Sequence, residues 1–375
     1  MTNLPRFPDA ARLYLRPAAL LSAAHEGPDA WQMAGTSQAF ASAEVIVSDA
    51  GERLYSSLHP VADLSRLAGE LPKSLSAQME ATLGRIREAR APLPLPSGAE
   101  LKLSRPLIMG VINVTPDSFS DGGRFSSSEA AIEQAQKLAA EGADILDIGG
   151  ESTRPGATTV WEGEEKDRVL PVIEGILELG LPVSVDTRRA SVMRAAIDAG
   201  AGIINDISAL TADEESLEVA SRAGTPVVLM HSLGDPQTMQ DNPRYDDVLL
   251  DVFDFLEQRI AAVEEAGIER RRIIVDPGIG FGKTVRHNAA LINGLSIFHG
   301  LGCPLLLGAS RKRFIAALSR EETVERRLAG SLAAGLKGIS QGVQMLRVHD
   351  VEETRQALAV TRGLLDVTFL PPSAD

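Results

Sequence analysis

The stretch at residues 107–123, LIMGVINVTPDSFSDGG, decides the fold. Its first seven residues end at Asn113 and are otherwise apolar and uncharged, which is typical of a strand buried on both faces. The residues after Asn113 are polar and rich in turn formers, with Pro116 and the pair Gly122 and Gly123. The stretch predicts a buried strand that delivers an amide and a polar loop to one place, although a simple surface loop fits this stretch alone equally well.

The same strand-then-helix unit recurs along the rest of the chain. Eight candidate strands lie at 107–113, 144–150, 182–187, 202–208, 226–231, 272–278, 304–310 and 343–350. Helical patterns separate them, and the longest, at 246–267, repeats apolar residues along one face. Eight such units in about 260 residues, with strands apolar on both faces, predict an α/β fold of the (β/α)8 TIM barrel type. A doubly wound open sheet is the alternative, which we disfavour because no glycine-rich dinucleotide fingerprint follows the first strand.

The first part of the chain follows a different pattern. A helical repeat of apolar residues runs over about 74–90, and the proline-rich run APLPLP at 91–96 ends it. Proline cannot continue a helix and stiffens an extended connection, so this run is a linker candidate. We expect residues 1–97 to form a small N-terminal α/β extension of unknown role, and residues 98–375 to form the barrel domain.

Composition narrows the class of protein. The chain has 375 residues, 44% of them hydrophobic, which is enough for one large domain and a smaller one. Its net charge of −14 argues against a protein that coats nucleic acid, so we expect no nucleic-acid partner. A single cysteine excludes an intrachain disulfide, and neither a signal peptide nor an apolar run of membrane-spanning length is found. We therefore expect a cytoplasmic protein without a membrane partner.

Polar residues follow every candidate strand. In a barrel of this kind the active site lies where the strands end at their carboxyl side, so these residues are expected to converge. Individually they also have structural explanations, since Asp186 and Asp206 can cap the next helix and His231 can be a hydrogen-bonded core histidine. Together they predict a ligand site, because burying so many polar groups without a ligand would leave donors and acceptors unpaired. The set comprises Asn113, Glu151, Asp186, Asn205, Asp206, His231, Asp276, Ser310, Arg311, Lys312, Arg347 and His349.

Two short patterns indicate the kind of ligand. The run GIGFGKT at 278–284 resembles a phosphate-binding P-loop, but Pro277 stands where the first glycine of that pattern belongs. We expect its glycines instead to turn tightly or to let the backbone approach a flat ligand. Arg347 and His349 lie two residues apart on one strand, so both can face one anion.

Metal binding is expected to rest on oxygen ligands. The histidines are scattered, and no histidine or cysteine metal-binding motif occurs in the sequence. Asn113, Asp117 and Asp121 offer oxygen atoms, which suit a Mg²⁺ ion that is carried by a substrate diphosphate and keeps some of its waters.

As a set, the strand ends resemble dihydropteroate synthase, a family of the folate pathway. The matching runs are GVINVTPDSFSDGG, DIGGESTRPGA, VSVDT, INDIS, VVLMH, DPGIGFGK, GASRKRFI and LRVHDV, in this order over about residues 105–368. The resemblance implies a transferase that condenses (7,8-dihydropterin-6-yl)methyl diphosphate with 4-aminobenzoate, giving 7,8-dihydropteroate and diphosphate, with Mg²⁺ as cofactor. It also implies a homodimer formed through the late barrel helices. The first hundred residues lie outside the resemblance.

The resemblance further implies a role for each site residue. The pterin ring would be bound by Asp186, Asn205, Met230, Asp276 and Lys312. The diphosphate and its Mg²⁺ would be bound by Asn113, Arg347 and His349, with Asn113 as the metal ligand. The aminobenzoate would be bound by Phe119, Thr153, Arg154, Pro155 and Ser310. Catalysis would depend on Asp121, Asp186, Lys312, Arg347 and His349. Diphosphate would leave first, and the amine would attack a cation that the pterin stabilises.

Two rival functions fit the same barrel. A pterin-binding methyltransferase domain would keep the ring contacts but needs neither a diphosphate site nor an aminobenzoate pocket. A non-catalytic pterin-binding relative would be expected to lack Asp121, Arg154 or Lys312, and all three are present. Both observations favour the synthase.

Overall fold

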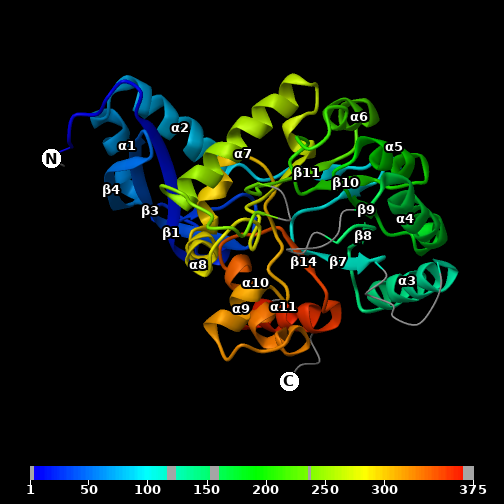
Figure 1. Ribbon diagram of the computed structural model, residues 1–375. Coiled ribbons are helices and arrows are strands. Elements are labelled where there is room, and N and C mark those ends of the chain that lie inside the picture. The colour runs from blue at the N-terminus through cyan, green and yellow to red at the C-terminus, as the bar shows by residue number, and fades with distance from the viewer. Residues whose placement is uncertain (1–3, 116–123, 153–159, 235–237, 366–375) are drawn as a thin grey trace.

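The computed structural model describes residues 4–115, 124–152, 160–234 and 238–365. Its centre is a sheet of eight parallel strands, each followed by helix or loop (Figure 1). The strands are β7 Leu107–Asn113, β8 Ile145–Gly149, β9 Val183–Asp186, β10 Ile203–Asp206, β11 Val227–Met230, β12 Ile273–Asp276, β13 Leu306–Leu307 and β14 Met345–Val348. Each coincides with a strand predicted from the sequence.

The order of the strands shows that this sheet is a barrel. Neighbouring strands run β12-β11-β10-β9-β8-β7-β14-β13, so that consecutive strands pair and β14 pairs with β7. A parallel bridge between Val275 of β12 and Leu305, just before β13, joins the two ends of the sheet. The barrel is therefore nearly closed, as predicted, and the doubly wound open sheet was the wrong alternative.

Helices surround the barrel. They are α3 Arg124–Ala140, α4 Glu162–Ile176, α5 Ala190–Asp198, α6 Ser216–Ala223, α7 Val248–Glu265, α8 Val285–Asn293, α9 Arg313–Leu318, α10 Leu328–Ile339 and α11 Val351–Leu365. The long helix α7 begins where predicted, because the Asp247 carboxylate accepts hydrogen bonds from the backbone N–H groups of Leu249 and Leu250. Among the described residues, none of these helices has the length and apolar character needed to cross a membrane.

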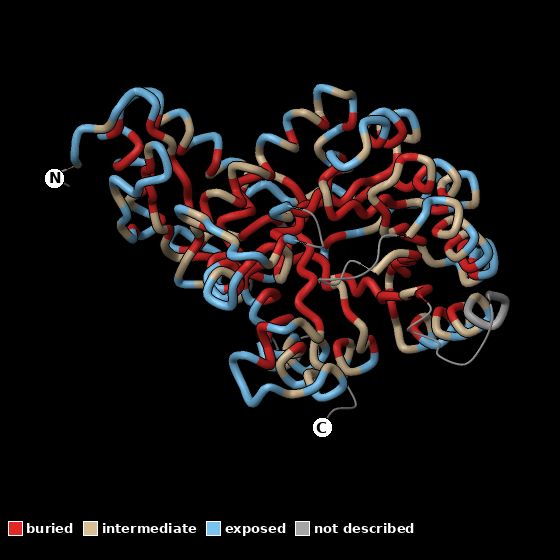
Figure 2. Tube along the Cα trace, in the orientation of Figure 1, coloured by how far each residue is buried: buried red, intermediate tan, exposed pale blue. Residues whose placement is uncertain are grey.

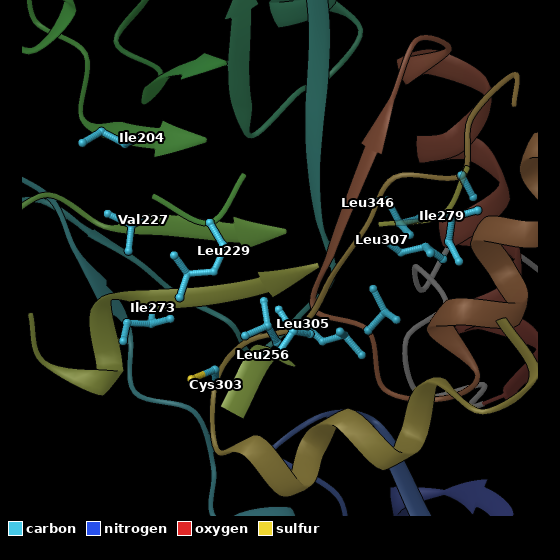
Figure 3. Close-up of a cluster of buried hydrophobic side chains, with 14 of the residues drawn as sticks. Ile204, Val227, Leu229, Leu256, Ile273, Ile279, Cys303, Leu305, Leu307 and Leu346 are labelled. Carbon is cyan, nitrogen blue, oxygen red and sulfur yellow. The ribbon is translucent and has the colours of Figure 1, made fainter. Parts of the chain in front are cut away.

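Apolar side chains fill two layers of the barrel. Because successive residues of a strand point to opposite faces, each strand contributes to both layers. The inner layer includes Met109, Ile145 and Val228, and the outer layer lies between strands and helices. Figure 3 shows part of the outer layer, where Val227, Leu229 and other strand residues meet Leu256 of α7. Exposed residues gather on the outward faces of the helices (Figure 2).

The N-terminal extension is an antiparallel sheet covered by two helices. Its strands are β1 Arg12–Ser22, β2 Trp31–Gln32, β3 Gln38–Asp49 and β4 Glu52–Pro60, and its helices are α1 Val61–Glu70 and α2 Lys73–Arg87. Strand β3 is central, pairing with β1 on one side and with β2 and β4 on the other. The α/β character of the extension is as predicted. The sequence indicated α2, but only short apolar patches marked the long strands.

The extension lies against α7 and the short helix η5 Leu295–Leu301. The Tyr14 ring meets Phe253 edge-on at 5.4 Å, and its hydroxyl group donates to Asp254 at 2.9 Å. The Arg90 guanidinium donates to the carbonyl oxygens of His299 at 2.9 Å and Cys303 at 3.2 Å. These contacts, several of them buried, attach the extension to the barrel.

A small hairpin follows the extension. It consists of β5 Leu93–Pro94 and β6 Glu100–Leu101, and Leu93 packs with the inner layer of the barrel. A boundary at residue 97 would fall between its two strands, so the division of the chain at that point remains a prediction.

Candidate active site

The strands bring several of the predicted site residues to one end of the barrel. Asn113, Gly149, Asp186 and Asn205 are successive partners across β7, β8, β9 and β10. On the next two strands of the sheet, Met230 pairs with Asp276 at the ends of β11 and β12. Each of these residues is the last or the next-to-last residue of its strand. Because neighbouring parallel strands pair in register, these ends lie at the same edge of the sheet. The predicted convergence therefore occurs.

A half-buried arginine forms the electrostatic centre of this end. The Nε atom of Arg347 lies 2.7 Å from Asp147 Oδ2, and its Nη2 atom lies 2.6 Å from Asp186 Oδ2. Asp147 is fully buried, and the Asn205 amide donates to its Oδ2 atom at 3.2 Å. Arg347 thus joins β14 to β8 and β9 through charge-assisted hydrogen bonds.

Asp147 was missed by the sequence analysis. It lies inside the strand sequence ILDIG, whereas the candidates were chosen from residues at or after strand ends. A charged residue within a strand buried on both faces is the signal that would have identified it, because such a charge needs a partner.

Burial raises the pKa values of two carboxyl groups at this end of the barrel. Burial raises the pKa of Asp186 to about 7, although the Arg347 cation acts in the opposite direction. Burial also raises the pKa of Asp276, and the Lys312 ammonium group opposes that rise. Both carboxylates therefore lack part of the stabilisation that water would give their charged forms. Ligand N–H groups that donate to these oxygens would supply it.

Lys312 enters the same end of the barrel from the turn before α9. Its Nζ atom donates to the Ile279 carbonyl oxygen and lies 4.5 Å from the centre of the Phe281 ring. Burial lowers the pKa of Lys312 to about 8, while Asp276 raises it. A Cβ atom at Gly308 would lie 3.6 Å from Asp276 Oδ2 and 3.9 Å from Lys312 Nζ, so these two charges flank the same small space.

Lys312 belongs to the run SRKR at residues 310–313, and the side chains of Ser310 and Arg311 in that run point to different partners. The Ser310 hydroxyl group lies 3.0 Å from Nδ1 of His349, which follows β14, and accepts from the His349 backbone N–H at 3.3 Å. Arg311 has a left-handed backbone with φ of +56° and pairs with Asp350. Ser310 and His349 contact each other and Lys312 lies near Asp276, and the roles predicted for these three residues remain predictions. Arg311, a candidate in the sequence analysis, is engaged at Asp350 instead.

Two candidates have structural roles. Asp206 is fully buried, and it accepts hydrogen bonds from the backbone N–H groups of Ser208 at 2.7 Å and Leu210 at 3.0 Å. It therefore holds the turn after β10. His231 is 5% exposed, and its Nδ1 atom lies 2.8 Å from Lys283 Nζ. Burial, and then the Lys283 cation, lower the pKa of His231 to about 2, so its ring is neutral at physiological pH. His231 is thus a hydrogen-bonded core histidine, as its structural alternative predicted, whereas Asp206 holds a turn and does not cap the next helix, α6.

Glu151, two residues after β8, makes hydrogen bonds to Val160 and Arg189. Its Oε1 atom accepts from the Val160 backbone N–H at 3.0 Å and from Arg189 at 3.0 Å. Arg189 also donates to the Val160 carbonyl oxygen at 2.5 Å and pairs with the buried carboxylate of Glu165. Arg189 and Glu165 were not predicted, because they pair with each other and with Glu151 and Val160 across 24 to 38 residues of sequence.

Several predicted residues are not described by the structure. Asp117, Phe119, Asp121, Thr153, Arg154 and Pro155 lie outside the described residues. Within the described residues, no group of three or more His, Cys, Asp or Glu side chains could hold a metal ion. Of the predicted metal ligands, Asn113 is the one that the structure describes. A Cβ atom at Gly149 would lie 3.9 Å from Asn113 Oδ1 and 3.8 Å from Asp186 Oδ2, so Asn113 and Asp186 both lie beside Gly149.

Comparison with known proteins places this geometry in a family. Residues 109–349 match the family model described as "Pterin binding enzyme". The dihydropteroate synthase of Escherichia coli (strain K12) is 46% identical over 269 residues, which cover 72% of this chain and 95% of that protein. Two solved structures are also similar, both of dihydropteroate synthase from Xanthomonas albilineans. The one with 4-aminobenzoic acid is 49% identical with a TM-score of 0.69, and covers 74% of this chain and 100% of its own. The one in complex with 7,8-dihydropteroate is 46% identical with a TM-score of 0.66, and covers 73% of this chain and 98% of its own.

Proposed function

The chain belongs to the dihydropteroate synthase family of pterin-binding enzymes, and from that premise we propose that the end of the barrel around Arg347 condenses (7,8-dihydropterin-6-yl)methyl diphosphate with 4-aminobenzoate. The observation that carries the proposal is the set of ion pairs in which Arg347 joins Asp147 and Asp186. Lys312 and Asp276 flank the adjoining space. Related structures that contain 4-aminobenzoic acid and 7,8-dihydropteroate support the assignment of both substrates.

The pterin ring is assigned to the carboxylates and the lysine. A pterin edge presents alternating donors and acceptors, so Asp186 and Asp276 accept from its N–H groups and Lys312 donates to its carbonyl oxygen. Asn205 adds an amide beside Asp186, and Met230 packs at the end of β11 beside Asp276. A site built from such buried polar groups discriminates strongly, because an analogue that lacks one partner leaves a buried group unpaired.

The diphosphate is assigned to Arg347, His349 and Asn113. The Arg347 guanidinium has five N–H donors, and its contacts with Asp147 and Asp186 leave donors that can serve an anion. His349 lies just after β14, two residues from Arg347, and is held by Ser310. Together they stabilise the charge that develops on the leaving group.

Magnesium fits the donors at this place. The Asn113 amide oxygen is the kind of hard ligand that Mg²⁺ takes, alongside waters and substrate phosphates. Asn113 would hold the ion, with Asp117 and Asp121 as the further candidates from the first loop. When bound, the ion neutralises negative charge on the diphosphate and so favours its departure.

The protein's own contribution is electrostatic and geometric. Once the carbon–oxygen bond to diphosphate breaks, the positive charge on the exocyclic carbon spreads into the pterin, and the carboxylates beside the ring stabilise it. Asp186 is assigned to this role because it lies within the site, with Arg347 maintaining its position. The amine of aminobenzoate then attacks the cation, the bond from nitrogen to carbon forms, and the nitrogen passes its proton to the released diphosphate or to water. The two bound substrates are held in the orientation for reaction, and together they exclude the water that would otherwise react with the cation.

Mass analysis of the product tests the proposed reaction. The purified protein is incubated with the dihydropterin diphosphate, Mg²⁺ and 4-aminobenzoate, and 7,8-dihydropteroate is the expected product. Isothermal titration provides a second test: aminobenzoate should bind only when diphosphate and Mg²⁺ are present. A methyltransferase domain or a non-catalytic pterin-binding protein would ignore aminobenzoate in both experiments.

The aminobenzoate pocket is assigned to Phe119, Thr153, Arg154, Pro155 and Ser310. Replacing Phe119 with alanine is expected to raise the KM for aminobenzoate and leave kcat nearly unchanged, because the lost contact serves the ground state and the transition state equally. Steady-state kinetics with each substrate varied in turn would measure the change. An unchanged KM for aminobenzoate would remove Phe119 from the pocket.

A homodimer through the late barrel helices is the proposed assembly. An open groove of about 460 Å³ lies among α8, α9 and α10, lined by apolar residues that include Ile292, Phe314, Ile315 and Leu318. Leu318 lines this groove with 63% of its surface exposed, so a second copy of the chain that docked there would cover it.

Replacing Leu318 with aspartate is expected to shift the protein from dimer to monomer, since it places a charge in the proposed contact. Light scattering coupled to size-exclusion chromatography would measure the mass. Leu58→Asp is a matched control, because Leu58 is 58% exposed on β4 of the extension. A dimeric Leu318→Asp variant would rule out this surface.

The remaining proposals concern the location and organisation of the chain. A cytoplasmic location is supported by the single cysteine, Cys303, which is buried as a free thiol. The extension, residues 1–97, is proposed as a distinct part with a structural role against α7 and η5. Its hydrogen bonds to Asp254, His299 and Cys303 support that role.

A further inference from the structure

Lys283 is a buried lysine with no place in the proposed mechanism. It is 3% exposed, and its Nζ atom lies 2.8 Å from His231 Nδ1, 3.0 Å from the Phe281 carbonyl oxygen and 3.2 Å from the His231 carbonyl oxygen. Burial lowers the pKa of Lys283 well below its usual value, and both the ammonium form and the neutral amine carry N–H bonds that can be donated to these acceptors. The His231 ring is neutral, so its Nδ1 atom can accept.

These acceptors belong to two different loops. His231 begins the loop after β11, and Phe281 lies in the loop after β12. The two loops are in close contact: a Cβ atom at Gly278 would lie 1.9 Å from the His231 carbonyl oxygen, and one at Gly282 would lie 2.6 Å from Leu233 Cβ. Lys283 therefore links the loops at a place where their backbones already touch.

The loop after β12 in turn contacts Asp276 and Lys312, two residues proposed to bind the pterin. Its Gly278 backbone N–H donates to Asp276 Oδ1 at 2.7 Å. Its Ile279 carbonyl oxygen accepts from Lys312 Nζ, and its Phe281 ring lies beneath that same ammonium group. The position of this loop therefore determines where both Asp276 and Lys312 can present their charges.

We propose that Lys283 is a positioning residue for the pterin site, which joins the loops after β11 and β12 so that Asp276 and Lys312 keep the separation that the ring requires. This inference rests on the proposed function. An apolar residue of similar size would fill the space but leave the His231 ring nitrogen and two carbonyl oxygens without their donor. The loop would then relax, and displacements of about 1 Å already have large kinetic effects.

Tyr245 provides a second, milder way to loosen the same loop. Its hydroxyl group donates to the Gly282 carbonyl oxygen at 2.8 Å, and its ring lies against His231 and His287. It is half-buried, so Tyr245→Phe removes one hydrogen bond without opening a cavity. Tyr14→Phe is the matched control, because it removes a similar hydrogen bond, to Asp254, in the extension.

The main experiment compares pterin and aminobenzoate kinetics in Lys283→Met. We expect the KM for the dihydropterin diphosphate to rise roughly 10- to 100-fold, with kcat reduced less and the KM for aminobenzoate unchanged. Binding of 7,8-dihydropteroate, measured by titration, should weaken in parallel. Tyr245→Phe should show a smaller change in the same direction, and Tyr14→Phe none. Lys283→Gln, which keeps donors at nearly the same place, should recover part of the pterin affinity.

Two outcomes would overturn the inference. One is a folded Lys283→Met variant with the pterin KM and product affinity of the wild type. If Lys283→Met does not fold, unchanged pterin affinity in Tyr245→Phe has the same force. A merely structural role would lower the melting temperature without separating the two substrates. Failure of the proposed function is distinguishable, because the wild-type protein itself would then form no dihydropteroate.

Discussion

Replacing Lys312 with alanine is expected to abolish measurable turnover, a loss of at least roughly 100- to 1,000-fold in kcat/KM, while the fold remains intact. The ammonium group faces Asp276 across the space beside Gly308, where it is assigned to the pterin carbonyl oxygen. Its side chain lies at the entrance of α9 and not within the apolar core, so its removal leaves the barrel in place. Steady-state formation of dihydropteroate, with thermal unfolding followed by circular dichroism, measures both effects.

Arg313 provides the control for Lys312. It is the next residue, it is exposed, and it carries the same charge. Arg313→Ala should therefore behave like the wild type, which would show that the loss depends on the buried ammonium group and not on the net charge of the turn. Formation of dihydropteroate at the wild-type rate by a purified Lys312→Ala variant would contradict the role assigned to this lysine.

The pH profile gives the same residue a second test. Burial lowers the pKa of Lys312 to about 8, so raising the pH through that value removes the ammonium charge. The value of kcat/KM for the dihydropterin diphosphate should therefore fall on the alkaline side of about pH 8. In Lys312→Arg, if residual activity is measurable, this decline should move to higher pH, because a guanidinium group stays protonated.

The sequence was sufficient to predict the barrel and most of its strand ends. The strand at 107–113 is apolar on both faces, and seven further strands at regular spacing leave few arrangements that bury them all. Asn113, Asp186, Asn205 and Asp276 could be located because the end of a parallel strand is visible as a change from apolar to polar residues.

Contacts between distant residues could not be predicted in this way. Lys283 and His231 are 52 residues apart, and nothing local marks them as partners. Arg311 and Lys312 are adjacent cations, yet one is engaged at Asp350 and the other enters the site, because the backbone at Arg311 is left-handed. Such directions depend on the packing of neighbouring elements, so the charges of a run do not reveal which side chain reaches a ligand.

Replacing Arg347 with alanine is expected to lower both activity and stability. The guanidinium group holds the carboxyl groups of the fully buried Asp147 and the partly buried Asp186, so its loss leaves both without their cation. Removing one partner of a buried ion pair typically costs about 3–5 kcal/mol, a large share of the roughly 5–15 kcal/mol by which a domain is stable. Urea denaturation and steady-state kinetics would measure the two losses. Arg347→Lys should recover some stability but little activity, since an ammonium group cannot form both fork contacts at once.

The dependence of this effect on pH distinguishes electrostatics from lost packing. Burial already raises the pKa of Asp186 to about 7 in the presence of Arg347, and removing the cation would raise it further. A carboxyl group whose pKa is higher in the folded than in the unfolded state takes up a proton on folding, so its unfavourable contribution grows as the pH rises and disappears as the pH falls. The destabilisation of Arg347→Ala should therefore be smaller at pH 5 than at pH 8. The double variant Arg347→Met/Asp147→Asn should regain part of the lost stability at pH 8 without regaining turnover, because it removes one of the two unpaired carboxylates but not the need for a cation at the diphosphate. Equal destabilisation at both pH values would mean that Arg347 acts through packing alone.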